Sequence, residues 1–331
     1  MGPGGTVFGK ARATDETPLG QHAAYSRGVR ESASGEAGGA NAADLVVEGA
    51  SKSYGRGPGR REALGGIDVR VRRGRFVSVI GPSGCGKSTL LRLMAGLEHP
   101  DAGTVSIFGS SPAEASGAKR IAFMPQVPAL LPWLSVLDNV LLVSKVNRRG
   151  LPAGVKPDRR ADAVALLTEL GLADALRRLP GELSGGMQQR VAIARAFATQ
   201  GDLLLMDEPF SALDEFTREA TQDQLLKLWE KWRTTVVFVT HSVTEAVVLS
   251  DEVIVMAGGP GAPGTIAAVV PIDLPRPRRR GLLEAAAVHE YEDLIRAELQ
   301  SAREGAPGDR HRDAFHDRSS GSVSDSEAGL A

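Results

Sequence analysis

The stretch Gly81–Thr89 constrains the fold more than any other part of the chain. Its sequence, GPSGCGKST, follows the apolar run Phe76–Ile80 and precedes the helical run Leu90–Ala95. In this setting the glycines let backbone N–H groups turn toward a phosphate, and the following helix presents its positive end to the same anion. The pattern predicts a P-loop inside an α/β core. A chance glycine-rich turn is the alternative, and it would require every fitting position to arise by accident.

The charged and hydroxyl residues of this loop have the chemistry that phosphate binding requires. Lys87 is expected to reach the β- and γ-phosphates of a nucleotide, and Ser88 to ligate Mg²⁺. Cys85 is the only cysteine, which excludes a disulfide or a thiolate metal cage within one chain, and we interpret it as a small loop residue. The loop residues predicted to bind the nucleotide are Gly81, Pro82, Ser83, Gly84, Cys85, Gly86, Lys87, Ser88 and Thr89.

Between about residues 44 and 275, short apolar runs alternate with helical patterns, which is typical of an α/β domain with a mostly parallel sheet. Continuous rather than alternating runs are expected where parallel strands are covered on both faces. The segments Leu45–Glu48 and Ile67–Val71 alternate more, which predicts an antiparallel β lobe beside the sheet. The candidate buried strands are Phe76–Ile80, Leu203–Met206, Val236–Val239 and Val253–Met256.

Residues 112–200 carry helical patterns interrupted by Pro and Gly, such as Arg160–Leu170 and Ala173–Leu179. No comparable strand-like run follows Ile121–Met124 in this interval. We therefore expect a helical subdomain at about 112–200, inserted into the P-loop NTPase core.

The two ends of the chain lack the apolar clusters that a folded core requires. Residues 1–43 and those after about 300 are rich in small and polar residues, so we expect disordered tails. The formal net charge is −1, from 39 Lys and Arg against 40 Asp and Glu, which argues against nucleic-acid binding. The sequence contains no run of about 18 apolar residues, so we expect no membrane-spanning helix. The single cysteine fits a reducing cytosol.

An acidic pair follows the apolar run Leu203–Met206. Asp207 and Glu208 are expected at the carboxyl edge of the sheet, where α/β folds bind ligands. Asp207 is expected to hold Mg²⁺ through water, and Glu208 to act as general base toward the attacking water. The alternative is that the two acids only end the strand, and the P-loop upstream argues against it.

The octet Leu183–Arg190, LSGGMQQR, resembles the signature motif of ABC-transporter ATPases, and further elements of that family occur in the family's order. Tyr54 matches the aromatic residue that stacks on adenine. Gln126 matches the Q-loop glutamine that contacts Mg²⁺ and the attacking water. The segment Ser211–Asp214 matches the D-loop, and His241 matches the switch histidine beside the γ-phosphate. The ordered set is far more specific than any one member, each of which has a purely structural alternative.

The signature octet also has a physical role. Ser184, Gly185 and Gly186 precede the helical stretch Met187–Ala198 and so form a helix N-terminus that can bind a γ-phosphate. The resemblance implies that this end closes over ATP held by the P-loop of a second copy, and it adds Asp214 to the ATP-binding residues. Two ATP molecules would then lie between two chains, so isolated monomers should hydrolyse ATP poorly.

The resemblance covers about residues 44–275, which implies an ATP-binding domain there, a tail at 1–43 and a C-terminal extension at 276–331. It further implies a homodimer of ATPase subunits on two permease subunits at the cytoplasmic face of the cell membrane. A periplasmic or lipid-anchored substrate-binding protein would act on this complex indirectly. The apolar stretch Pro128–Val140 is expected to be part core and part groove for the permease, with Leu131–Leu134 in the groove.

Three strings are similar to the nitrate/sulfonate/taurine import group: Leu131–Trp133, Leu213–Glu219 and Leu274–Arg278. This similarity implies a bacterial importer of aliphatic sulfonates or taurine, with nitrate or a thiamine precursor as the alternative cargo. The ATPase subunit does not touch the cargo, so its sequence does not choose among them. The basic run Arg276–Arg280 favours a solvated loop, with contact to membrane phosphates as the alternative.

A non-transport ABC ATPase and an exporter subunit are the rival classes. Tandem translation factors carry two P-loops and two signatures, whereas this chain has one of each. Repair ATPases insert long coiled coils, but no sustained heptads occur between Lys87 and Ser184. Exporters often fuse their membrane part to the ATPase, so a separate permease favours the importer.

Overall fold

The computed structural model describes residues 44–146, 159–259, 261–278 and 286–304. The predicted tail at 1–43 and the residues from 305 onward lie outside the described residues. The strands are β1 (Leu45–Tyr54), β2 (Arg61–Val71), β3 (Phe76–Ile80), β4 (Ala102–Ile107), β5 (Ile121–Met124), β6 (Leu203–Asp207), β7 (Thr235–Val239), β8 (Glu252–Gly259) and β9 (Ala262–Pro271). The α-helices are α2 (Lys87–Met94), α3 (Pro112–Gly117), α4 (Val136–Val146), α5 (Arg159–Glu169), α6 (Gly185–Ala198), α7 (Glu215–Trp232), α8 (Val243–Leu249) and α9 (Ala286–Arg303).

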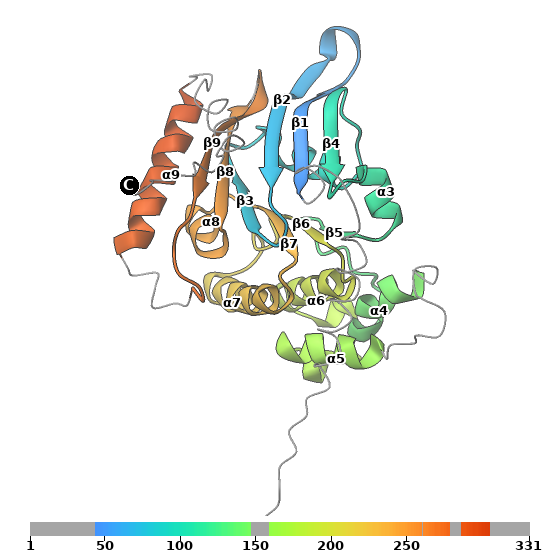
Figure 1. The fold of residues 1–331 in the computed structure, drawn as a ribbon. Coiled ribbons are helices and arrows are strands. Elements are labelled where there is room, and N and C mark those ends of the chain that lie inside the picture. Colours follow the sequence, from blue (N-terminus) through green and yellow to red (C-terminus); the bar gives the residue numbers. More distant parts are fainter. Residues whose placement is uncertain (1–43, 147–158, 260, 279–285, 305–331) are drawn as a thin grey trace, which may run out of the picture. The chain divides into compact units, whose positions relative to one another are not determined.

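Within the described residues, nine strands form one sheet in the order β4-β1-β2-β9-β8-β3-β7-β6-β5 (Figure 1). The five adjacent strands β8, β3, β7, β6 and β5 all pair in parallel. At the other end of the sheet, β1 pairs antiparallel with both β2 and β4. The structure thus confirms the predicted core with a mostly parallel sheet and an antiparallel lobe, and the four predicted buried strands correspond to β3, β6, β7 and β8.

The parallel strands bury side chains on both faces. Along β3, Phe76 packs in the core beneath α4 to α7, whereas Val77 and Val79 pack in the core formed with α2 and the antiparallel lobe. The strand β6 alternates in the same way, with Leu204 in the first core and Leu203 in the second. Because neither face meets water, these strands are mostly apolar, and the buried Ser78 of β3 is hydrogen-bonded to Ser250.

The helices α4, α5 and α6 pack against one another, and α6 also contacts α7 (Figure 1). The strand β5 falls inside the interval predicted as helical, but it pairs with β6 in the sheet, so the helices of this subdomain begin at Val136. The predicted helical pattern Ala173–Leu179 contains only the 3₁₀ turn Ala173–Ala175. A second 3₁₀ turn, Pro180–Glu182, begins after Leu179. The predicted segment of seven residues is too short to be stable as an α-helix by itself.

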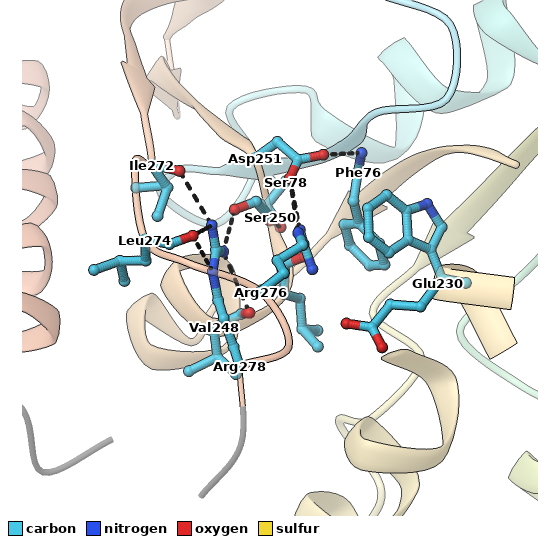
Figure 2. A network of polar contacts seen from close by, with 12 residues as sticks. Phe76, Ser78, Glu230, Val248, Ser250, Asp251, Ile272, Leu274, Arg276 and Arg278 are labelled. Atoms are coloured by element: carbon cyan, nitrogen blue, oxygen red, sulfur yellow. Dashed lines mark hydrogen bonds and ion pairs between the residues drawn. The ribbon is translucent and has the colours of Figure 1, made fainter. Parts of the chain in front are cut away.

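In the described part of the basic run after β9, Arg278 is buried and Arg276 is half-buried, so these two side chains belong neither to a solvated loop nor to a lipid contact (Figure 2). The guanidinium of Arg278, 5% exposed, donates to the backbone oxygens of Val247 at 2.9 Å, Ile272 at 3.1 Å and Leu274 at 3.2 Å. Burial lowers the pKa of Arg278 to about 10, so it remains charged at neutral pH. Arg279 and Arg280 lie outside the described residues.

Arg276 makes the second half of this network. It donates from Nε to Asp251 Oδ1 at 2.9 Å, its Nη2 lies 2.8 Å from the same oxygen, and its guanidinium lies 4.2 Å from the ring centroid of Trp229. Asp251 in turn accepts from the backbone N–H of Phe76 at 2.9 Å. The segment after β9 is therefore tied to the start of β3 and to α7 by charge-assisted hydrogen bonds and a cation–π contact.

The helix α9 packs against α8 and β8 at one side of the sheet (Figure 1). Val288 and Ile295 join the small core that β8 and α8 form with Ile80. The hydroxyl of Thr244 on α8 is hydrogen-bonded to Glu292 on α9. The sequence patterns did not predict this helix. None of the helices in the described ranges, α9 included, is long and apolar enough to cross a membrane.

Candidate functional site

The predicted P-loop lies between β3 and α2, and its glycines adopt the backbone that the turn demands. Gly84 and Gly86 have φ of 77° and 78°, a region that side chains disfavour. A Cβ at Gly86 would also lie 2.5 Å from the backbone oxygen of Ala63, so the loop is packed against β2. Gly86 is the N-cap of α2, and no side chain caps the first N–H groups of this helix. The loop can thus present a ring of N–H donors to a phosphate.

Lys87 is buried at the start of α2. Its ammonium donates to the backbone oxygens of Gly81 at 3.0 Å and Pro82 at 3.3 Å, so the charge is held inside the loop. Cys85 is fully buried, and this burial raises the pKa of its thiol. A buried, protonated thiol fits a packing role for Cys85 and not a reactive one. Among the described residues, no cluster of three or more His, Cys, Asp or Glu could hold a metal.

The hydroxyl of Ser88 and the carboxylate of Asp207 lie together at the edge of the sheet. Ser88 Oγ donates to Asp207 Oδ1 at 3.1 Å, which joins the first turn of α2 to the end of β6. Mg²⁺ prefers oxygen ligands, and in phosphate sites one or two protein ligands suffice because phosphate and water oxygens fill the remaining positions. One hydroxyl and one carboxylate are therefore a donor set that fits Mg²⁺ bound together with a nucleotide.

Three predicted catalytic side chains come from three neighbouring strand ends and meet. Glu208 follows β6, and one of its carboxylate oxygens contacts Nε2 of His241, which follows β7. Its other oxygen accepts from Nε2 of Gln126, which follows β5, at 3.2 Å. Because parallel strands end at the same edge of a sheet, residues separated by more than a hundred positions converge here.

The backbone of Glu208 is held in an unusual conformation. Its φ is 47°, which is rare for a residue with a side chain. The strain is offset by hydrogen bonds: its N–H donates to the oxygen of Val239 at 3.0 Å, and its oxygen accepts from the hydroxyl of Ser211 at 3.1 Å. Strained backbone of this kind concentrates at functional sites. It turns the carboxylate of Glu208 away from that of Asp207, which faces Ser88.

The signature segment forms a helix N-terminus, as predicted. Ser184 is the N-cap of α6, and its hydroxyl accepts from the N–H of Met187 at 3.3 Å. Gly185 and Gly186 form the first turn, and a Cβ at Gly186 would lie 2.4 Å from Cγ2 of Thr217, so α6 and α7 approach closely there. The contacts of this turn run within α6 and to α7. The structure therefore does not bring it to the P-loop of its own chain, consistent with a role toward a second copy.

Asp214 and Tyr54 both lie in exposed positions. Asp214 is the N-cap of α7 and accepts from the N–H of Thr217 at 3.0 Å. Hydrogen bonds from Thr217 hold the pKa of Asp214 below its usual range, so the carboxylate is charged at neutral pH. Tyr54 ends β1 with 38% of its surface exposed, and the ammonium of Lys52 lies 5.7 Å from its ring centroid. An exposed ring of this kind is free to stack on a base.

Glu245 was not among the predicted site residues, yet its buried carboxylate lies beside the loop that carries His241. It is hydrogen-bonded to the hydroxyl of Thr240 and accepts from Gln222 Nε2 at 3.1 Å. The sequence signal at this position, Ser242 followed three residues later by Glu245, is that of a helix start. It gives no indication that the carboxylate is buried against α7.

The family model described as "ABC transporter" matches residues 64–211, the interval from β2 to the D-loop. The "Aliphatic sulfonates import ATP-binding protein SsuB 1" of Xanthomonas axonopodis pv. citri is 47% identical over 240 residues, which are 72% of this chain and 91% of that protein. The chain belongs to the ABC transporter family.

Other relatives of this ABC transporter protein carry a different cargo in their names. The "Bicarbonate transport ATP-binding protein CmpC" of Synechocystis is 45% identical over 218 residues, 66% of this chain. The match covers 32% of CmpC, so the chain spans about a third of the length of that relative. Bicarbonate was not among the cargoes predicted from the sequence.

A solved structure titled as a dimeric, post-hydrolysis state of the ATP-binding cassette MJ0796 bound to ADP and Pi has the same fold. It superimposes with a TM-score of 0.61 at 32% identity, over 70% of this chain and 99% of that one. The ABC ATPase fold of this chain is thereby confirmed.

Proposed function

We propose that this chain is the ATP-hydrolysing subunit of an ABC importer. The observation that carries the proposal is the convergence of Gln126, Glu208 and His241 beside the pair of Ser88 and Asp207. These side chains come from the ends of β5, β6 and β7 and from the first turn of α2, and they supply what hydrolysis of a γ-phosphate requires: a base, a hydrogen-bonding histidine and glutamine, and oxygen ligands for Mg²⁺.

Each group of residues has a separate role in the proposed reaction. The P-loop N–H groups and Lys87 bind the β- and γ-phosphates, and Tyr54 stacks on adenine. Bound Mg²⁺, held by Ser88, Asp207 and Gln126, would neutralise charge on the phosphate oxygens. Glu208 accepts the proton of the attacking water, while His241 fixes the carboxylate and donates a hydrogen bond at the γ-phosphate.

The second half of each ATP site comes from another copy of this chain. The helix N-terminus at Ser184, Gly185 and Gly186 does not contact the P-loop of its own chain. In a dimer, this helix end would lie on the γ-phosphate of the ATP that the second copy binds, with Asp214 nearby. The dimeric structures of the related MJ0796 cassette support this assembly. Two permease subunits would receive the dimer, which places it peripherally on the cytoplasmic face of the cell membrane.

The cargo is proposed to be an aliphatic sulfonate or taurine. Three relatives at 44% to 47% identity are named for aliphatic sulfonate import. The CmpC and CmpD relatives, at 41% to 45% identity, favour bicarbonate as the second candidate. All these names describe small anions, whose recognition belongs to a permease and a substrate-binding protein and not to this subunit.

Replacement of Glu208 by Gln tests the chemistry. The amide keeps the size of the side chain but cannot accept a proton, so turnover is expected to fall at least about a hundredfold. Binding of a fluorescent ATP analogue should stay within about twofold, because no phosphate contact is removed. Glu290→Gln, an exposed substitution on α9, is the matched control. Retained turnover in Glu208→Gln would exclude Glu208 as the base.

The cargo is tested in proteoliposomes that contain the permease, the substrate-binding protein and this subunit. Stimulation of ATP hydrolysis is measured with the binding protein loaded with an aliphatic sulfonate, taurine, nitrate or bicarbonate. Stimulation by sulfonate or taurine supports the proposal. If only bicarbonate or nitrate stimulates hydrolysis, the proposed cargo is wrong, and the proposed ATPase activity is unaffected.

A further inference from the structure

The loop that carries His241 is fastened on both sides by one buried residue, Glu245. On one side, the hydroxyl of Thr240 donates to the Glu245 carboxylate and also accepts from the N–H of Ser242 at 3.0 Å. On the other side, the N–H of Glu245 donates to the hydroxyl of Ser242 at 3.2 Å. His241 itself is half exposed and makes its contact with Glu208, so its position depends on these two neighbours.

The same carboxylate faces α7. Its Oε1 accepts from Nε2 of Gln222 at 3.1 Å and lies 3.8 Å from Nε of Arg218. Arg218 donates from Nη2 to the oxygen of Leu213 at 2.7 Å, and its Nε lies 3.4 Å from the oxygen of Phe210. These two oxygens belong to the segment between Glu208 and Asp214. Glu245 therefore lies between the histidine loop and the chain segment that leads from the proposed base to the D-loop.

Burial of this carboxylate is costly and is only partly compensated. Glu245 is 7% exposed, and burial raises the pKa of its carboxyl, with the charge of Glu208 adding to the effect. The hydroxyl of Thr240, the amide of Gln222 and the cation of Arg218 oppose that shift. A helix start alone does not require a buried charge, since an exposed Glu at the same turn would serve α8 equally well.

We propose that Glu245 is a positioning residue for hydrolysis: its buried carboxylate joins the loop of His241 to the segment after Glu208, and so fixes the distance between the two. The inference rests on the proposed roles of His241 and Glu208. When α7 and the D-loop move, Arg218 and Glu245 carry that movement to His241. The site is then sensitive to whatever contacts the D-loop, which is the surface offered to a second copy.

The test compares Glu245→Gln with Glu290→Gln in the purified full-length chain. An amide is neutral and has one acceptor oxygen, so Glu245→Gln loses the charge that faces Arg218 and cannot accept both from the Thr240 hydroxyl and from Gln222 through separate oxygens. The turnover rate of Glu245→Gln should fall between about ten- and a hundredfold, the range seen when catalytic groups are slightly misplaced. KM and the affinity for a fluorescent ATP analogue should change by less than about twofold.

A second readout separates positioning from structural support. The melting temperature of Glu245→Gln should be unchanged or higher, because the substitution removes the desolvation cost of a buried carboxylate. Thr240→Val, which removes the hydroxyl at constant shape, should reproduce the loss of turnover, and Thr240→Ser should restore it. Combining Glu245→Gln with His241→Ala should add nothing to the loss caused by His241→Ala alone.

Two results would overturn the inference. The first is a turnover rate of Glu245→Gln within about twofold of the unsubstituted chain. The second is a loss of turnover that accompanies an equal loss of melting temperature and nucleotide affinity. The proposed function fails separately, if Glu208→Gln and His241→Ala both retain turnover. If those two variants are inactive and Glu245→Gln is not, only the inference about Glu245 is wrong.

Discussion

Single glycines decide whether the phosphate loop can form at all. Gly84 and Gly86 have nearly the same left-handed φ, 77° and 78°, but they differ in what surrounds them. A Cβ at Gly84 would meet nothing within 4 Å, whereas a Cβ at Gly86 would lie 2.5 Å from the Ala63 oxygen and 2.7 Å from Leu64 Cδ2. The two positions thus separate the effect of backbone conformation from the effect of close packing.

We predict that Gly86→Ala destabilises the protein more than Gly84→Ala. Both substitutions place a side chain in the left-handed region, which costs about 1 kcal/mol of unfolding free energy. Gly86→Ala adds steric overlap with β2, worth a further ~1–3 kcal/mol. Urea denaturation of the two variants gives the difference, and nucleotide affinity should follow the same order. Equal losses of stability would show that the loop moves away from β2 without cost.

The elements that follow directly from the sequence are those with a strong local signal. The apolar runs at β3, β6, β7 and β8 were predictable because strands buried on both faces consist mostly of apolar residues. The P-loop and the helix start at Ser184 were predictable because the backbone chemistry of a turn or a cap restricts residue types locally. The order of the strands was not predictable, since pairing between β3 and β8 joins residues far apart in the chain.

The segment from β9 to α9 shows why other parts of the fold were not predicted from the sequence. Arg276 and Arg278 lie in a basic run, which on charge alone indicates an exposed loop. Their partners are Asp251 and the backbone oxygens around Val247 and Ser250, about thirty residues upstream, and only the fold brings these together. The buried carboxylate of Glu245 was missed for the same reason, because its burial depends on α7.

We predict that α9 contributes to the stability of the whole domain through Ile295. This side chain is fully buried against β8 and α8, while its neighbour Leu294 is 46% exposed. Ile295→Ala should lower the free energy of unfolding by about 2–5 kcal/mol, from lost burial and the cavity left behind. Leu294→Ala, the matched control, should change it by less than about 0.5 kcal/mol. Similar, small effects in urea denaturation would mean that α9 is not part of the cooperative unit.

At the scale of the whole molecule, the expected permease surface lies after the strand end that carries Gln126. Trp133 is 70% exposed there, on a turn that is held by hydrogen bonds. The buried side chain of Asn139 donates to the oxygens of Leu131 at 3.1 Å and Leu134 at 3.0 Å and accepts from the N–H of Leu131 at 2.8 Å. An exposed tryptophan on a fixed turn loses little conformational freedom on binding, which suits an interface anchor. This supports the expectation that Leu131–Leu134 contacts the permease.

We therefore predict that Trp133→Ala weakens assembly with the permease without altering the ATP site. A central aromatic anchor contributes about 2 kcal/mol, so the affinity for the permease should fall ~30-fold. ATP hydrolysis by the purified subunit alone should be unchanged, because Trp133 is absent from the polar contacts around Glu208. The matched control is Leu97→Ala, which removes an apolar side chain 62% exposed, just beyond the end of α2. Assembly is measured by titration of the subunit onto permease in detergent. If the affinity is unchanged in Trp133→Ala, the permease binds elsewhere, and the hydrogen bonds of Asn139 serve only the packing of α4.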